Sequence, residues 1–83
     1  MAERRIRMRY FASAAEAAGP EEETVSTTAA TTGELRLELA ARFGPAMARV
    51  LDAGSLLVDG VVRRAEDAVL GDAVDVLPPF AGG

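Results

Sequence analysis

Alternating apolar and polar side chains near the start of the chain predict a β-strand. From position 5 to position 11 the two kinds of residue take turns, which is the period of a strand with one buried face. The inward set is Ile6, Met8 and Tyr10, and the outward set is Arg5, Arg7, Arg9 and Phe11. We interpret the arginines as a solvated sheet face. A large apolar residue in the same outward row, Phe11, indicates a contact surface.

A helix is predicted to begin after Thr31. Thr31 and Glu34 have the capping-box spacing, in which each side chain bonds the backbone of the other residue. Apolar residues then recur every four positions at Leu35, Leu39 and Phe43, which gives the helix one buried stripe. Leu37 points away from this stripe. Glu38 and Arg42 have the spacing of an ion pair along one helix, and Gly44-Pro45 ends the helix.

The other segments are shorter, and most are bounded by glycine or proline. Asp59-Gly60 fits a tight hairpin turn between two apolar runs. In chain order we expect a short helical turn or a loop over 12–18, an acidic loop over 21–23 and an edge strand over 24–28. A second helical turn over 46–53, strands over 55–58 and 61–62, and a last strand over 73–77 follow.

This order of elements predicts an α+β fold in a single domain spanning 1–83. Two strands, one long helix and two or three further strands give a mixed sheet of four or five strands. One main helix can cover only one sheet face. A ubiquitin-like β-grasp arrangement, with the first and last strands parallel in the centre, satisfies these constraints. Its open face would carry Phe11, Val62 and Leu77 as a small apolar patch for a partner.

The overall composition limits the possible partners. The 83 residues are 49% hydrophobic and 27% charged, which is ordinary for one globular domain. No apolar run is long enough to cross a membrane, and no secretory leader opens the chain. We therefore expect a cytoplasmic protein without membrane contacts. The net charge of −4 disfavours nucleic acid and favours a basic protein partner.

Three missing residue types restrict the chemistry. The chain has no Cys and no His, and all nine of its basic residues are Arg. It therefore lacks a thiol nucleophile, an imidazole base and a lysine amine. We expect no catalytic residue, no metal site and no bound cofactor. Covalent chemistry would have to use a carboxylate, a hydroxyl group or a chain terminus.

The last six residues supply a terminus suited to such chemistry. Two prolines restrict the backbone and remove two donors, so the chain should leave its last strand as an extended spur. Two glycines without a Cβ then carry the terminal carboxylate, and a chain of this width fits a narrow channel. We expect a flexible tail over 78–83 that threads into a partner, although a frayed end without function is the alternative. Its residues are Pro78, Pro79, Phe80, Ala81, Gly82 and Gly83.

Nearly the whole chain resembles the β-grasp sulfur carriers that end in Gly-Gly, and it is most similar to small subunits of molybdopterin synthase. The spacing of Pro-Pro before Gly-Gly is the most specific feature. Asp59 stands where Asn is commoner in the family, and Phe80 stands where Val is commoner. The motifs that carry the resemblance are Tyr10-Phe11-Ala12, Thr32-Gly33-Glu34-Leu35, Val58-Asp59-Gly60, Leu70-Gly71-Asp72 and Leu77-Pro78-Pro79-Phe80-Ala81-Gly82-Gly83.

The resemblance implies a carrier rather than an enzyme. An adenylating, ubiquitin-activating-like enzyme would use ATP to activate Gly83, and a separate sulfur donor protein would then convert Gly83 to a thiocarboxylate. The large catalytic subunit of molybdopterin synthase would receive the tail, in a heterotetramer, and transfer the sulfur to cyclic pyranopterin monophosphate. In the family, the positions of Phe11, Val62 and Leu77 contact partners.

Other functions share this fold and this activation step. One alternative is a sulfur carrier for thiamine, cysteine or thiolated tRNA, which the Pro-Pro spacing disfavours. Another is a ubiquitin-like modifier that is joined to lysines of other proteins. A small interaction domain with an incidental Gly-Gly end is the third.

Overall fold

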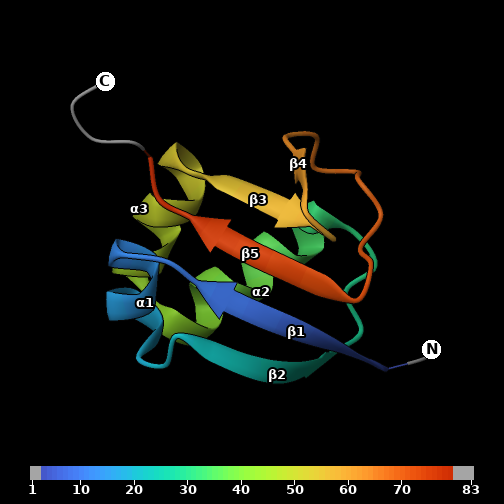
Figure 1. Ribbon diagram of the computed structural model, residues 1–83, viewed down its shortest axis with the longest axis horizontal. Helices are drawn as coiled ribbons and strands as arrows, with labels where there is room; N and C mark the ends of the chain where they lie inside the picture. The colour runs from blue at the N-terminus through green and yellow to red at the C-terminus, as the bar shows by residue number, and fades with distance from the viewer. Residues whose placement is uncertain (1–2, 80–83) are drawn as a thin grey trace.

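The computed structural model describes residues 3–79, which form five strands and three helices (Figure 1). In chain order the elements are β1 (Arg4–Tyr10), α1 (Ser13–Ala18), β2 (Glu22–Thr27), α2 (Thr32–Phe43), α3 (Pro45–Ala53), β3 (Ser55–Val58), β4 (Val61–Arg63) and β5 (Ala73–Leu77).

The strands form one mixed sheet in the order β2-β1-β5-β3-β4. β1 and β5 are parallel neighbours in its centre, and every other pairing is antiparallel. All three helices lie on the same side of the sheet (Figure 1). The other side is covered by no helix of the described chain, so the predicted β-grasp architecture is confirmed, open face included.

The core lies between the sheet and the helices. Ile6, Met8 and Tyr10 of β1 are buried, and the arginines that alternate with them are exposed, so the predicted facing of this strand is confirmed. Leu35 and Leu39 of α2 are buried, whereas Leu37 is 75% exposed. No helix within residues 3–79 is long and apolar enough to span a membrane.

The predicted helix cap and helix break are both present. Thr31 accepts a hydrogen bond from the backbone of Glu34, and the Glu34 carboxylate accepts one from the backbone of Thr31. Gly44 has φ 93°, a conformation that favours glycine and cannot continue α2. Pro45 then takes the first position of α3, where its missing donor costs nothing. The expected short turn over 46–53 is therefore a nine-residue helix.

Two predictions about charged residues are wrong. Glu22 and Glu23 belong to β2 rather than to an acidic loop, and Glu38 and Arg42 do not pair with each other. Arg42 instead makes two hydrogen bonds to Glu23, of 2.9 and 3.0 Å, and Glu38 accepts one from Thr27. Both α2 side chains thus reach across to the edge strand. Helix periodicity cannot predict this, because the bonds depend on how α2 packs against β2.

Candidate functional site

The last strand delivers the chain end from the centre of the sheet. β5 pairs with β1 on one side and with β3 on the other, where Ser55 lies opposite Leu77. Pro78 follows directly and is half-buried, and Pro79 is exposed. The predicted spur therefore begins at a fixed point held by two ladders. The remaining tail residues of the prediction, Phe80, Ala81, Gly82 and Gly83, lie outside the described residues.

Gly54 makes this exit point possible. It ends α3 and lies against β5, where a Cβ would stand 2.0 Å from the carbonyl oxygen of Leu77 and 2.8 Å from that of Val50. Real Cβ atoms do not approach oxygen so closely, so only glycine allows the helix end to pack at the base of the tail. The sequence marks Gly54 only as a glycine between two elements. Its contact with Leu77 depends on tertiary structure.

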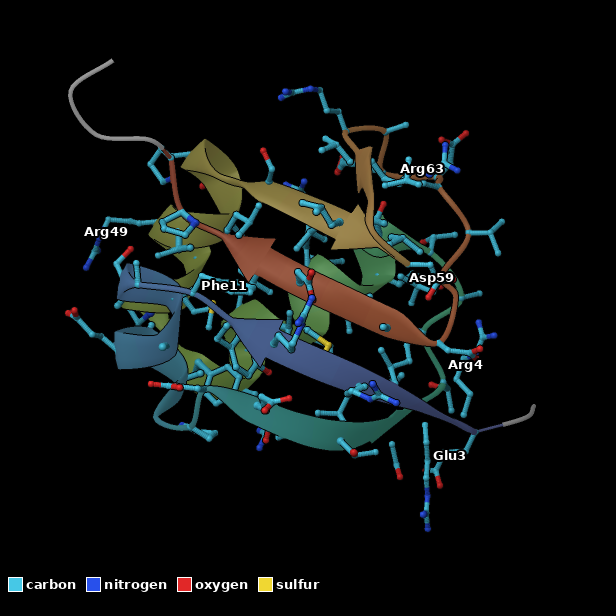
Figure 2. All side chains as sticks on the ribbon, in the orientation of Figure 1. Glu3, Arg4, Phe11, Arg49, Asp59 and Arg63 are labelled. Atoms are coloured by element: carbon cyan, nitrogen blue, oxygen red, sulfur yellow. The ribbon has the colours of Figure 1, made fainter. Side chains whose placement is uncertain are left out.

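A hollow lies beside the first tail residues. It measures about 430 Å³ and is formed by α1 and α3 together with Pro79. Arg49 borders it from α3 and points away from the body of the protein (Figure 2). The hollow is thus a concave surface formed by helices at the base of the tail, on the side of the protein away from the open sheet face.

The open sheet face brings two of the three predicted patch residues together. Tyr10 lies opposite Val76 in the parallel ladder, so Phe11 and Leu77 are the next residues of neighbouring strands. A hydrogen bond of 3.1 Å from the Phe11 amide to the Val76 carbonyl holds Phe11 beside β5 (Figure 2). Phe11 is 39% exposed, and Leu77 is half-buried. These two side chains are the apolar surface next to the tail.

Val62 lies farther away, on the edge strand. It is 46% exposed and pairs with Leu57, which in turn pairs with Asp75. Leu57, which the sequence analysis did not single out, therefore links Val62 to the centre of the sheet. Its place on the outer face follows from the alternation with buried Leu56 and Val58. The apolar surface thus has two parts, Phe11 with Leu77 and Leu57 with Val62.

An ion pair lies beside both parts of the apolar surface. Asp75 and Arg9 face each other across the parallel ladder and form two hydrogen bonds of 2.8 Å. The Asp75 side chain is only 10% exposed, and that of Arg9 is 51% exposed. The hydrogen bonds and the charge of Asp75 raise the pKa of Arg9 above its already high value. Alternation alone puts both residues on this face, but their pairing requires the register of β1 and β5.

Two family motifs meet at the start of β5. Asp59 and Gly60 have φ 49° and 85°, as a tight hairpin turn requires. The Asp59 carboxylate accepts hydrogen bonds of 3.1 and 3.0 Å from the backbone of Asp72 and Ala73. A Cβ on Gly71 would lie 1.8 Å from the same carboxylate. Val58-Asp59-Gly60 and Leu70-Gly71-Asp72 therefore fix where β5 begins, close to Asp59 (Figure 2), and so where the strand ends at Leu77.

A second network holds the far edge of the sheet against α2. Glu23 accepts a 2.6 Å hydrogen bond from the hydroxyl of Tyr10 in addition to the two from Arg42. Burial of the Glu23 carboxylate acts to raise its pKa, but these hydrogen bonds and the Arg42 charge outweigh burial and lower the pKa. Burial and Glu23 together raise the pKa of Tyr10. Phe43 packs edge-on against Tyr10. These contacts are structural and lie away from the tail.

The arrangement of Figure 1 defines a class. A mixed sheet with parallel central strands, helices on one side and the last strand in the middle is the architecture of ubiquitin-like carriers. The chain belongs to the ThiS family, which matches residues 8–83. This is a family of ubiquitin-like sulfur carriers, whose small proteins are generally not catalytic.

Solved structures agree with this assignment. The HVO 2177 protein of Haloferax volcanii is 26% identical with a TM-score of 0.78, and the alignment covers 98% of this chain and 88% of that one. A protein described as molybdopterin converting factor subunit 1 of Pyrococcus furiosus is 26% identical with a TM-score of 0.74, over 92% and 98% of the two chains.

A third structure bears a different name. Small archaeal modifier protein 1 of Haloferax volcanii is 27% identical with a TM-score of 0.73, over 96% of this chain and 100% of that one. Among curated proteins, no sequence matches this chain.

Proposed function

We propose that this protein is the sulfur-carrying small subunit of a molybdopterin synthase. The observation that carries the proposal is the exit of Pro78-Pro79 from the central strand, beside Phe11 and Leu77, which follow the Tyr10–Val76 pair of the parallel ladder. The same two prolines stand two residues before Gly82-Gly83 in the sequence. The similarity to the molybdopterin converting factor subunit of Pyrococcus furiosus supports the pathway.

In this proposal Gly83 is the site of loading. An adenylating enzyme joins the Gly83 carboxylate to AMP and releases pyrophosphate from ATP, because a free carboxylate is a poor electrophile. The terminal sulfur of a donor protein's persulfide then displaces AMP, and a thiol cleaves the resulting acyl disulfide. The products are the Gly83 thiocarboxylate and a disulfide on the donor. General acid and base groups belong to the partners.

Unloading takes place in the large subunit of the synthase. Its channel receives the tail from Pro78 onward, and its body rests on Phe11 and Leu77. Two successive sulfur transfers to cyclic pyranopterin monophosphate build the dithiolene, and each returns Gly83 to the carboxylate. Val62 contributes from the edge strand. The carrier provides a rigid base and a narrow end, and it binds no cofactor itself.

Reconstitution with an adenylating enzyme, ATP and a persulfide donor tests the loading step. Intact-mass measurement should show one oxygen replaced by one sulfur, localised to Gly83 in the C-terminal peptide. The same measurement on untreated protein checks that Gly83 bears the free carboxylate. Deleting Gly83 should abolish the product without changing the melting temperature. Sulfur incorporation in the deletion variant would refute the proposal.

A second candidate function is conjugation to other proteins, as the name of the 27% identical Haloferax protein suggests. Both functions begin with adenylation of Gly83, so they diverge only afterwards. Restored molybdenum-enzyme activity in a carrier-deficient cell supports the synthase. Branched peptides with Gly83 joined to a lysine of another protein, found without such restoration, would favour the modifier.

A further inference from the structure

The outer face of β1 carries more arginines than the ion pairs of the described fold require. Arg5, Arg7 and Arg9 all point to the open side of the sheet, and only Arg9 has an ion-pair partner among residues 3–79. Arg7 lies between Thr24 of β2 and Ala73 of β5, and Arg5 lies opposite Ser26. These neighbours are short and uncharged. The guanidinium groups of Arg5 and Arg7 are therefore left with exposed donors.

The row of arginines on β1 costs free energy through charge repulsion, and Arg5 and Arg7 make no ion pair in the described structure that would offset it. Arginines two positions apart on one strand lie about 7 Å from each other, and their charges repel. The buried side of β1 is made by Ile6, Met8 and Tyr10, so the core does not need the arginines. The chain has 13 acidic residues, yet none of those described pairs with Arg5 or Arg7. A local cost of this kind is typical of a binding surface.

The arginines continue directly into the apolar surface next to the tail. Arg5, Arg7, Arg9 and Phe11 follow one another on the same side of the strand, over about 20 Å. The six residues after Leu77 can span no more than about 20 Å. A protein that holds Gly83 must therefore bring its own surface close to Leu77 and Phe11. An interface of ordinary size, about 800 Å² on each partner, is large enough to extend along β1 toward Arg7 and Arg5.

We infer that Arg5 and Arg7 form a docking strip for an acidic surface of the enzyme that adenylates Gly83. This inference rests on the proposed function and adds the chemistry of the partner. Carboxylates of the enzyme would form ion pairs with the guanidinium groups of Arg5 and Arg7, while an apolar side chain of the enzyme covers Phe11 and Leu77. Charges at the rim of an interface act mainly on the association rate. The strip orients the carrier so that its tail reaches the enzyme's active site.

The charge of the strip itself, Arg5 with Arg7, is opposite to the net charge of the molecule. The net charge of −4 predicts a basic partner, whereas the strip selects an acidic one where it docks. A nucleic acid is not the partner, because two phosphate contacts on a negatively charged protein bind too weakly at physiological salt.

A double substitution, Arg5→Gln with Arg7→Gln, tests the strip. The control is Arg63→Gln with Arg64→Gln, which removes the same charge from exposed residues at and just beyond β4 (Figure 2). Pyrophosphate release by the adenylating enzyme is measured against carrier concentration at low and high salt. We expect the Arg5/Arg7 variant to lose about tenfold in kcat/KM at low salt, with kcat unchanged, since each rim charge contributes about threefold.

The control should lose less than about twofold, and the difference between the variants should shrink at high salt. Equal losses in the two variants, or a loss that does not depend on salt, would overturn the inference. Melting temperatures of both variants check that they fold. If wild-type carrier is adenylated normally and only the strip prediction fails, the proposed function still holds. If the wild type is not adenylated at all, the proposed function fails, and the docking strip fails with it.

Discussion

Single residues in this protein act by fitting the backbone together at the base of the tail. Gly54 lets α3 end against the carbonyl of Leu77, and the carboxylate of Asp59 accepts hydrogen bonds from the amides of Asp72 and Ala73 at the start of β5. Neither residue carries chemistry. Each sets the position from which the last strand releases the chain, so their substitutions should be read first as changes in stability.

Replacing Gly54 with Ala should destabilise the protein by about 3 kcal/mol, because the backbone of α3 or β5 must move to admit the new methyl group. The measurement is urea unfolding followed by circular dichroism. Gly60→Ala is the control for backbone strain, because Gly60 has φ 85° but open space around its Cβ position. It should cost about 1 kcal/mol. A Gly54→Ala protein as stable as wild type would show that the close approach is not rigid.

The carboxylate of Asp59 should be replaceable by the amide of Asn but not by Ala. Asn tolerates the positive φ and keeps an oxygen that accepts from Asp72 and Ala73, so Asp59→Asn should change stability by less than about 0.5 kcal/mol. Asp59→Ala loses both hydrogen bonds and should cost about 1–2 kcal/mol in urea unfolding. Equal effects of the two substitutions would contradict the role assigned to the side-chain oxygen.

At the scale of elements, the edge strand β2 is attached to α2 through Glu23, Arg42 and Tyr10. The pKa of Glu23 is lower in the folded state than its ordinary value of 4.5. A lowered carboxyl pKa stabilises the fold above the unfolded pKa, and this contribution is lost as pH falls through the folded pKa. The contribution is therefore complete at neutral pH and disappears in acid.

Glu23→Gln should flatten the dependence of stability on pH below about pH 5, where the carboxylate of the wild type begins to be protonated in the unfolded state. The variant should be less stable than wild type at pH 7 and should lose less on acidification. Urea unfolding at a series of pH values measures both effects. Glu22→Gln is the control on the exposed side of β2. The assignment would be wrong if Glu22→Gln flattened the curve as much as Glu23→Gln does.

The main elements of the fold follow from the sequence because their signals are local. The capping box at Thr31, the alternation through Met8 and the Asp59-Gly60 turn each depend on neighbouring residues, and the structure contains all three. The partners of charged side chains do not follow, because Arg42 and Glu23 meet only after α2 packs on β2. The Arg9–Asp75 pair similarly depends on the parallel register.

The sequence predicts only part of the candidate site, because some of its signals are local and others depend on tertiary contacts. Phe11 and Leu77 could be placed on the open face by alternation, and the central position of β5 brings them together. Leu57 and Gly54 were missed, since the first is one leucine of an ordinary strand and the second needs the contact with Leu77 to have meaning. For Val62, the distance from Phe11 depends on the order of strands in the sheet.

For the whole molecule, the two faces of the sheet differ in what covers them. The helices cover one side of the sheet (Figure 1), and Phe11 lies on the other, open side. Leu37 is more exposed than Phe11, at 75% against 39%, but it lies on α2, away from the open face. Exposure alone therefore does not identify a binding surface. Substituting Phe11 and Leu37 in turn separates the effect of location from the effect of exposed hydrophobic area.

Phe11→Asp should lower kcat/KM for adenylation of Gly83 by at least about tenfold, because aromatic residues at the centre of an interface carry much of the binding energy. Leu37→Asp should change kcat/KM by less than about twofold. Both variants should keep most of their stability, as measured by urea unfolding. A large loss of kcat/KM in Leu37→Asp alone would move the binding surface to the helical side.

The central position of β5 also determines how the domain responds to force. A pull on the C-terminal end reaches the fold at Leu77 and runs along the strand, against the ladders to β1 and β3 together. Such a load shears many hydrogen bonds at once instead of opening them one after another. We therefore expect the fold to resist a pull applied at this end, so a protein-unfolding motor that engages it should stall.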